Sequence, residues 1–137
     1  MDLTRALIVY YSRTGTTRVV ARAIHKELGC RIERIADRRR RSGLVGYLRS
    51  GFDAIFHRLT VLRPMNTNPN EYDFVIVGTP IWNASVSTPV RTFLHANRDR
   101  IRHIAFFCTQ GGRGSARAFR QMDRICGQKP VATLVVG

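Results

Sequence analysis

Residues 6–17 read ALIVYYSRTGTT, six apolar or aromatic residues followed at once by a loop rich in hydroxyl groups around Gly15. An apolar run without polar alternation is typical of a parallel strand that is buried on both faces of its sheet, here residues 6–11. Apolar residues then recur at helical spacing over residues 17–28, and Gly29 ends the helix. The stretch therefore predicts a strand, a short loop and a helix, the first half of a βαβ unit.

The same alternation continues to the end of the chain. The other segments with strand-like composition are residues 30–36, 74–77, 104–108 and 131–136. The other segments with apolar residues at helical spacing are 44–59, 86–96 and 115–126. Strict alternation of strands and helices predicts an α/β fold, an open doubly wound sheet of five parallel strands. No repeat or linker divides the chain, so residues 1–137 are expected to form one domain.

Composition excludes several classes of protein. An apolar content of 44% is too high for a disordered basic tail. No apolar run approaches the roughly 18 residues of a membrane span, and the first residues lack the features of a signal peptide. The three cysteines show no CxxC spacing and the four histidines no ligand spacing, so neither a disulfide scaffold nor a metal site is predicted. We therefore expect a cytoplasmic protein.

The charge is strongly positive. The chain has 23 Lys+Arg against 9 Asp+Glu, a formal net charge of +14, and all the basic residues except Lys26 and Lys129 are arginines. Guanidinium groups favour phosphate and carboxylate, which indicates an anionic partner: nucleic acid, an acidic protein, a membrane surface or a phosphorylated ligand. An arginine-rich solvated surface without a partner is the alternative, for the run Arg38 to Arg41 in particular.

The loop at residues 12–17 is the first candidate for a binding site. It places four hydroxyl side chains and a glycine at the start of a helix, where N–H groups and the helix dipole favour an anion. It matches neither the Walker A pattern nor the dinucleotide fingerprint GxGxxG. A cradle of hydroxyls without a lysine suits a small terminal phosphate, and a simple N-cap turn is the alternative.

Two later loops also follow predicted strands. Residues 78–85 contain Trp82, the only tryptophan, which could stack on a flat aromatic ligand or pack the loop onto the domain. Residues 109–114 contain three glycines, which permit close approach of the backbone to a ligand or form a flexible turn. Ligands of open parallel sheets bind beyond the carboxyl ends of the strands, so the three loops together predict one site.

These segments resemble the flavodoxin-like family: YYSRTGTTRVVA at 10–21, VGTPIWNASVSTPVRTFL at 77–94 and AFFCTQGGRG at 105–114. The resemblance implies a parallel sheet of order 2-1-3-4-5 that binds FMN non-covalently. By position, it implies these cofactor-binding residues: Ser12, Arg13, Thr14, Gly15, Thr16 and Thr17 at the phosphate, Thr79, Pro80, Ile81, Trp82, Asn83 and Ala84 at one face of the ring, and Thr109, Gln110, Gly111, Gly112 and Gly114 at the other.

The implied function is electron or hydride transfer by FMN, with no catalytic side chain. We favour an oxidoreductase that acts on a small acceptor such as a quinone, because basic surroundings stabilise the negative charge that two-electron reduction adds. The loop at 109–114 has no aromatic residue, which would leave room for a substrate. The alternatives are a one-electron shuttle between protein partners and a flavin-free module that binds nucleic acid or another anion. Nucleic acid is disfavoured, because aromatic residues are sparse among the basic ones and no recognition helix is found.

The resemblance also implies a helix after the fifth strand, which this sequence lacks. Right-handed crossovers would place the helix at 17–28 on one face of the sheet and the helices at 44–59, 86–96 and 115–126 on the other. Apolar side chains of the strands at 74–77, 104–108 and 131–136 would then be bare on the first face. Such a face predicts a homodimer, or a chain that is a shortened form of a longer one.

Overall fold

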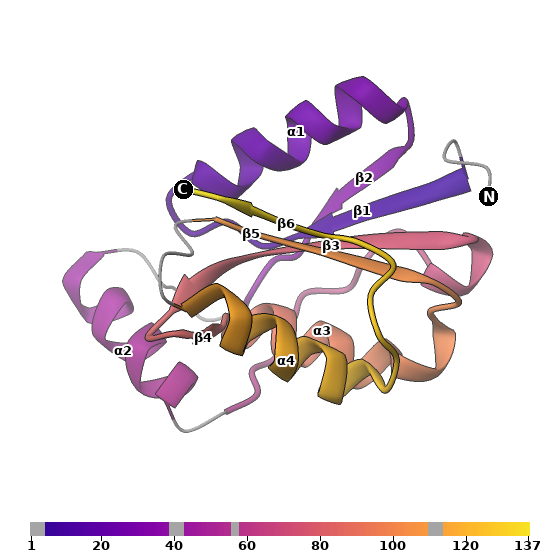
Figure 1. Ribbon diagram of the computed structural model, residues 1–137. Helices are drawn as coiled ribbons and strands as arrows, with labels where there is room; N and C mark the ends of the chain where they lie inside the picture. Colours follow the sequence, from indigo (N-terminus) through magenta and orange to yellow (C-terminus); the bar gives the residue numbers. More distant parts are fainter. Residues whose placement is uncertain (1–4, 39–42, 56–57, 110–113) are drawn as a thin grey trace.

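The computed structural model describes residues 5–38, 43–55, 58–109 and 114–137, and its strands form one twisted sheet between helices (Figure 1). In chain order the elements are β1 (Ala6–Tyr10), α1 (Thr16–Leu28), β2 (Arg31–Arg34), α2 (Gly43–Ile55), the 3₁₀ turn η2 (Pro69–Glu71), β3 (Phe74–Trp82), β4 (Ser85–Val86), α3 (Thr88–Asn97), the 3₁₀ turn η3 (Arg98–Arg100), β5 (Ile104–Thr109), α4 (Ser115–Cys126) and β6 (Thr133–Val136). Within these described ranges, no helix is long and apolar enough to cross a bilayer.

The sheet has the order β2-β1-β3-β5-β6, and neighbouring strands on this path are parallel. The register aligns Ile8 with Ile76 and Phe107 with Leu134. The short β4 pairs only with the end of β3, in the antiparallel sense. Apart from this hairpin, the predicted order 2-1-3-4-5 is confirmed.

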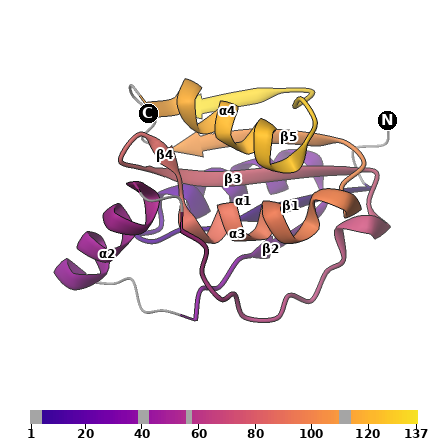
Figure 2. The same cartoon turned by 90° about the horizontal axis from the view of Figure 1, so that it is seen from below.

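Helices cover both faces of the sheet. In Figure 1, α1 lies above the sheet, and α3 and α4 lie below it. Figure 2, seen from below, shows α3 and α4 in front of the strands. Strand residues alternate between two apolar clusters: Ile8 and Ile76 pack with Ala21 of α1, whereas Val9 and Val77 are in the cluster that contains Phe93 and Met122. Both faces of the sheet are buried, so the strands are apolar without alternation.

A close contact between β3 and β5 completes the face under α1. Gly78 lies opposite Phe107, and a Cβ added to Gly78 would lie 2.0 Å from Cζ of the Phe107 ring. The ring therefore lies across the strand where any other residue would carry a side chain. The side chains of Ile76 and Phe107 are 7% and 1% exposed. The expectation that strands 74–77 and 104–108 would be bare on this face is wrong.

The exposed apolar side chain of the described strands on that face belongs to the edge strand β6. Leu134 of β6 is 47% exposed, and it shares the face of Phe107. The contact of α1 reaches across β3 as far as β5, which is why the inner strands need no fifth helix. The homodimer stays a prediction, with a smaller apolar surface behind it than the sequence indicated.

The placement expected for the helix at 44–59 is also wrong. The observed α2 does not cover the sheet with α3 and α4, but lies beyond the carboxyl ends of the strands, at the left in Figures 1 and 2. Among the α2 residues whose burial is described, Gly46, Ser50 and Asp53 are buried, whereas Leu44 and Val45 are exposed. Gly46 and Ser50 are small enough for the helix backbone to approach the body, and α3 and α4 already fill the sheet face.

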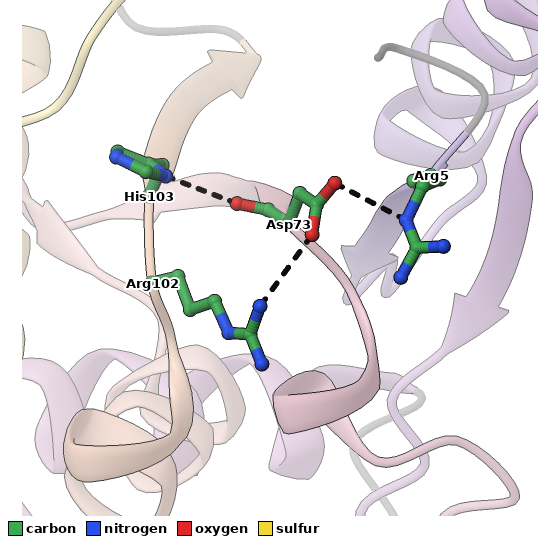
Figure 3. A network of polar contacts seen from close by, with 4 residues as sticks. All are labelled: Arg5, Asp73, Arg102 and His103. Carbon is green, nitrogen blue, oxygen red and sulfur yellow. Dashed lines mark hydrogen bonds and ion pairs between the residues drawn. The ribbon is translucent and has the colours of Figure 1, made fainter. Parts of the chain in front are cut away.

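Polar contacts around Asp73 connect the amino ends of the central strands, at the end of the sheet opposite the carboxyl ends (Figure 3). Arg5 Nε lies 3.1 Å from one carboxylate oxygen and Arg102 Nη1 lies 3.6 Å from the other. His103 Nδ1 lies 3.1 Å from the Asp73 carbonyl oxygen. The carboxylate separates two guanidinium groups where β1, β3 and β5 begin, although an exposed pair of this kind contributes only about 0–1 kcal/mol.

We predict that Gly78→Ala lowers the free energy of unfolding by about 2–3 kcal/mol, because the new methyl group would overlap the Phe107 ring. Denaturant unfolding measures the loss. Combining it with Phe107→Leu should cost less than the sum of the two single changes, since the shorter side chain leaves room for Cβ. Unchanged stability of Gly78→Ala, or strict additivity, would contradict this packing.

Candidate functional site

A cavity of about 530 Å³ opens at the carboxyl ends of the central strands. It lies where β1 connects to α1 and β3 continues into its hairpin, the point at which strand order reverses. Its lining residues are Ser12, Arg13, Thr14, Thr16, Thr17, Tyr47, Leu48, Ser50, Phe52, Pro80, Ile81, Trp82, Asn83 and Thr109. The volume lies within the range of small-molecule and cofactor sites.

The loop between β1 and α1 forms one wall and is shaped as an anion cradle. Gly15 has φ of 108°, a left-handed conformation that disfavours other residues, and its N–H donates to Ser12 Oγ at 2.9 Å. Helical hydrogen bonding begins when Val19 N–H donates to the Gly15 carbonyl oxygen, so the earlier N–H groups of α1 have no partner within the helix. Arg34 holds the loop from β2 by donating to the Ser12 carbonyl oxygen at 3.2 Å.

The hairpin of β3 and β4 forms the second wall. Ile81 pairs with Val86 and Trp82 with Ser85, which leaves a two-residue turn at Asn83 and Ala84. Both turn residues have positive φ, as a type I′ turn requires. The predicted loop is thus an extension of the sheet, and its side chains are held in fixed positions.

Trp82 has two roles in this hairpin. It lines the cavity, yet only 8% of it is exposed, and its ring meets Tyr11 edge to face at a centroid distance of 5.6 Å. The two readings of the tryptophan, ligand contact and packing of the loop, are therefore compatible. Most of its surface is engaged in packing, which leaves an edge of the ring for a ligand.

A hydrogen bond joins the first wall to the end of β5. The hydroxyl oxygens of Thr17 and Thr109 lie 2.7 Å apart, and both side chains are buried. These two residues line the cavity from the first turn of α1 and from the last residue of β5. The pair ties the start of α1 to the sheet and positions two hydroxyl groups for a ligand.

Ten of the residues that the resemblance implied line the cavity: Ser12, Arg13, Thr14, Thr16, Thr17, Pro80, Ile81, Trp82, Asn83 and Thr109. Gly15, Thr79, Ala84 and Gly114 are described but do not line it. Gln110, Gly111 and Gly112 lie outside the described residues. A role in FMN binding stays a prediction for every residue named in this paragraph.

The four described residues that do not line the cavity have structural roles beside it. Gly15 gives the cradle its turn, and Ala84 supplies the second position of the hairpin turn. Thr79 is fully buried, and its Oγ1 accepts a hydrogen bond from Ser87 N–H at 3.0 Å. A Cβ on Gly114 would lie 2.7 Å from Ala84 Cα, so glycine at this position lets the backbone next to α4 lie against the hairpin.

Helix α2 supplies a third wall, which was not predicted from the sequence. Tyr47, Leu48, Ser50 and Phe52 line the cavity. The Arg13 guanidinium lies 5.4 Å from the centroid of the Tyr47 ring, in a cation–π contact across the mouth. The apolar spacing of 44–59 was visible, but such a stripe usually packs on a core, so it indicated burial instead of a binding wall.

The residues that line the cavity suit a ligand with an anionic group attached to a flat ring. Hydroxyl and N–H groups gather at the start of α1, and apolar or aromatic side chains form the other walls. Arg13 is the only charged side chain among the described lining residues. This combination of hydroxyl donors and apolar walls fits an organic cofactor with a phosphate group, as FMN has. No group of three or more potential metal ligands occurs among the described residues.

Sequence comparison decides the family. Residues 56–134, more than half of the chain, match the flavodoxin family. The chain belongs to the flavodoxin family. The predicted resemblance is thereby confirmed, although the match does not include the loop between β1 and α1. Among curated proteins, none matches this flavodoxin significantly.

Solved structures share the fold. A flavoprotein from Lactobacillus acidophilus NCFM, crystallised in complex with FMN, has a TM-score of 0.83 and 22% identity, and the match covers 95% of this flavodoxin and 91% of that chain. A flavodoxin, WrbA-like protein from Agrobacterium tumefaciens has a TM-score of 0.61 and 14% identity over 96% and 82% of the chains. An NADH:FMN oxidoreductase in its apo form has a TM-score of 0.51 and 16% identity over 95% and 75%.

We predict that the cysteines of the native flavodoxin resist alkylation. Burial raises the pKa of Cys108, next to Thr109 in the cavity lining, to about 11, and burial also raises the pKa values of Cys30 and Cys126. The thiolate is the reactive form, so reaction with iodoacetamide at pH 8 should be slow until guanidinium unfolds the chain. Mass spectrometry counts the labels, and fast labelling of native Cys108 would contradict its burial.

Proposed function

We propose that this flavodoxin binds FMN non-covalently in the cavity and uses it as an oxidoreductase that reduces a small acceptor such as a quinone. The observation that carries the proposal is the juxtaposition of a hydroxyl-rich helix start with apolar walls at the point where strand order reverses. FMN supplies the electron or hydride transfer when bound, so the protein need only bind it and set its surroundings.

The phosphate of FMN would lie at the start of α1. Thr14, Thr16 and Thr17 line the cavity there, and each can donate a hydroxyl hydrogen bond. Gly15 keeps the loop in its left-handed turn, and Ser12 fixes that turn through Gly15 N–H. The positive end of the helix dipole adds to the attraction for the anion.

The ring would lie between the hairpin and α2. Pro80, Ile81 and the exposed edge of Trp82 offer apolar contact on one side, and Tyr47 and Phe52 offer aromatic rings on the other. Asn83 on the hairpin turn carries amide groups that could bond the polar rim of the ring. This arrangement leaves the mouth beside α2 for a substrate.

The charge around the cavity favours an enzyme over a one-electron shuttle. Arg13 lines the cavity and Arg34 binds the cradle, and no acidic side chain is among the described lining residues. Positive charge stabilises the negative charge that two-electron reduction adds to a flavin. The three free, buried cysteines agree with a reducing compartment, for which we infer the cytoplasm.

Gly15→Val should weaken FMN binding at least about tenfold, because a β-branched residue does not tolerate the φ of Gly15 and the cradle must change shape. The matched control is Gly29→Val at the other end of α1, where φ is 64° and nothing lies within 4 Å of an added Cβ. Both variants should lose stability, but only Gly15→Val should lose affinity. Titration of FMN fluorescence measures binding, and equal affinities would remove the cradle from the site.

Turnover separates the two redox functions. Protein reconstituted with FMN should oxidise NADH or NADPH, directly or through a reductase, with 1,4-benzoquinone as acceptor, and the apoprotein should not. Steady-state absorbance follows the nicotinamide. Failure with the quinone together with rapid reduction of cytochrome c would favour the one-electron shuttle. Protein that retains no yellow chromophore after reconstitution would overturn both functions, and salt-dependent oligonucleotide binding would then favour the flavin-free alternative.

A further inference from the structure

Helix α2 leaves much of its apolar side exposed to solvent. Leu44, Val45, Tyr47, Leu48 and Phe52 are 49–73% exposed, and together they form what we call the apolar crest. The positions that pack against the body are Gly46, Ser50 and Asp53, on the other side of the helix. An amphipathic helix normally packs its apolar side against the core and exposes its polar side. An exposed apolar surface such as the crest is typical of an interaction site.

Helix α2 protrudes from the molecule. Figures 1 and 2 both show it standing out from the end of the sheet, beyond the strands, and it contacts the helix α3. A protruding helix with Leu, Val, Tyr and Phe on its outer side has the shape of a segment that inserts into an interface. A partner protein would instead need a groove that accommodates it.

The exposed charge around the crest is positive. The charged residues of α2 are Arg49 and Asp53, and Asp53 is buried. Arg13 lies over the Tyr47 ring, and the Arg58 guanidinium lies 5.1 Å from the centroid of the Phe52 ring. The described parts of residues 34–63 contain five arginines and two aspartates. Of these aspartates, Asp37 is half-buried and accepts a hydrogen bond from Thr60 Oγ1.

We propose that the apolar crest docks on the surface of a bilayer that contains anionic lipid. The apolar side chains would enter the boundary between head groups and acyl chains, as those of interfacial amphipathic helices do. The surrounding arginines would contact the lipid phosphates, as basic residues near an anionic surface do. Tyr47 suits this depth, because it has an apolar ring and a polar hydroxyl group.

A second copy of the chain fits the crest poorly. In a two-fold symmetric dimer the same patch faces itself, so Arg49 and Arg58 of one copy would approach those of the other. Like charges brought together at an interface oppose association. The charge that complements the crest is negative, and an anionic bilayer supplies it over the whole crest.

Docking would also place the cavity at the membrane. Tyr47, Leu48 and Phe52 belong both to the crest and to the cavity wall. The mouth would then face the lipid boundary, where an apolar acceptor such as a lipid-dissolved quinone could enter without crossing water. This step rests on the proposed function, whereas the docking itself does not depend on FMN.

Vesicle sedimentation tests the docking with the full chain. We expect the protein to bind vesicles of phosphatidylcholine mixed with phosphatidylglycerol at least about tenfold more tightly than vesicles of phosphatidylcholine alone, and to be released by high salt. Val45→Glu should weaken binding to the mixed vesicles at least about tenfold, because it places a carboxylate on the crest and nowhere in the cavity.

The matched control is Val131→Glu, the same substitution at another exposed valine, before β6 at the far end of the molecule. It changes net charge equally and should leave vesicle binding close to that of the wild type. Equal loss in both variants, equal binding of Val45→Glu and the wild type, or no vesicle binding by the wild type would overturn the proposal. Light scattering that shows a dimer, dissociated by Val45→Glu and unable to bind vesicles, would identify a second copy as the occupant.

The flavin spectrum of the same samples keeps the two proposals apart. Val45 does not line the cavity, so Val45→Glu should retain FMN as the wild type does. Loss of vesicle binding with FMN retained would support the docking surface and leave the cofactor site intact. A wild-type protein that docks on vesicles but holds no FMN would overturn the proposed function alone.

Discussion

The parallel pairing of β1 with β3 is the constraint on which the rest of the structure depends. It sets β1 between β2 and β3, so the chain leaves β1 toward one face and leaves β3 toward the other. Tyr11 N–H donates to the Gly78 carbonyl oxygen at 3.2 Å, which carries the contact to the point where the two strands separate. The cavity opens beyond that point, and the cradle and the hairpin form its opposite walls.

The position of α2 links the cavity to the outer surface. Ser50 faces inward and lines the cavity, and Leu44 and Val45 face outward. Because Gly46 and Ser50 are small, the helix can lie close to the body on its polar side, which leaves its large apolar side chains at least half exposed or nearly so. One helix therefore contributes both to a binding site and to an exposed apolar surface within a strongly basic molecule.

The strands were predictable where burial on both faces makes the sequence continuously apolar. Residues 6–11, 74–77 and 104–108 correspond to β1, β3 and β5. The end of β3 was not predicted, because Gly78, Thr79 and Pro80 lack the apolar character of a buried strand. Gly78 is in the strand because the Phe107 ring fills its space, and Thr79 is buried because Ser87 bonds its hydroxyl. Both causes lie outside the strand, one on β5 and the other just after β4.

The sequence by itself determined the α/β class, the alternation of elements and the loops that border the cavity, because these depend on local patterns of apolar residues, hydroxyls and glycines. Only the tertiary structure decided which side of α2 packs inward. The periodicity of a helix defines an apolar side, but the space left by α3 and α4 determines whether that side is buried. Tyr47 and Phe52 thus became part of the cavity wall, and Leu44 and Val45 became surface.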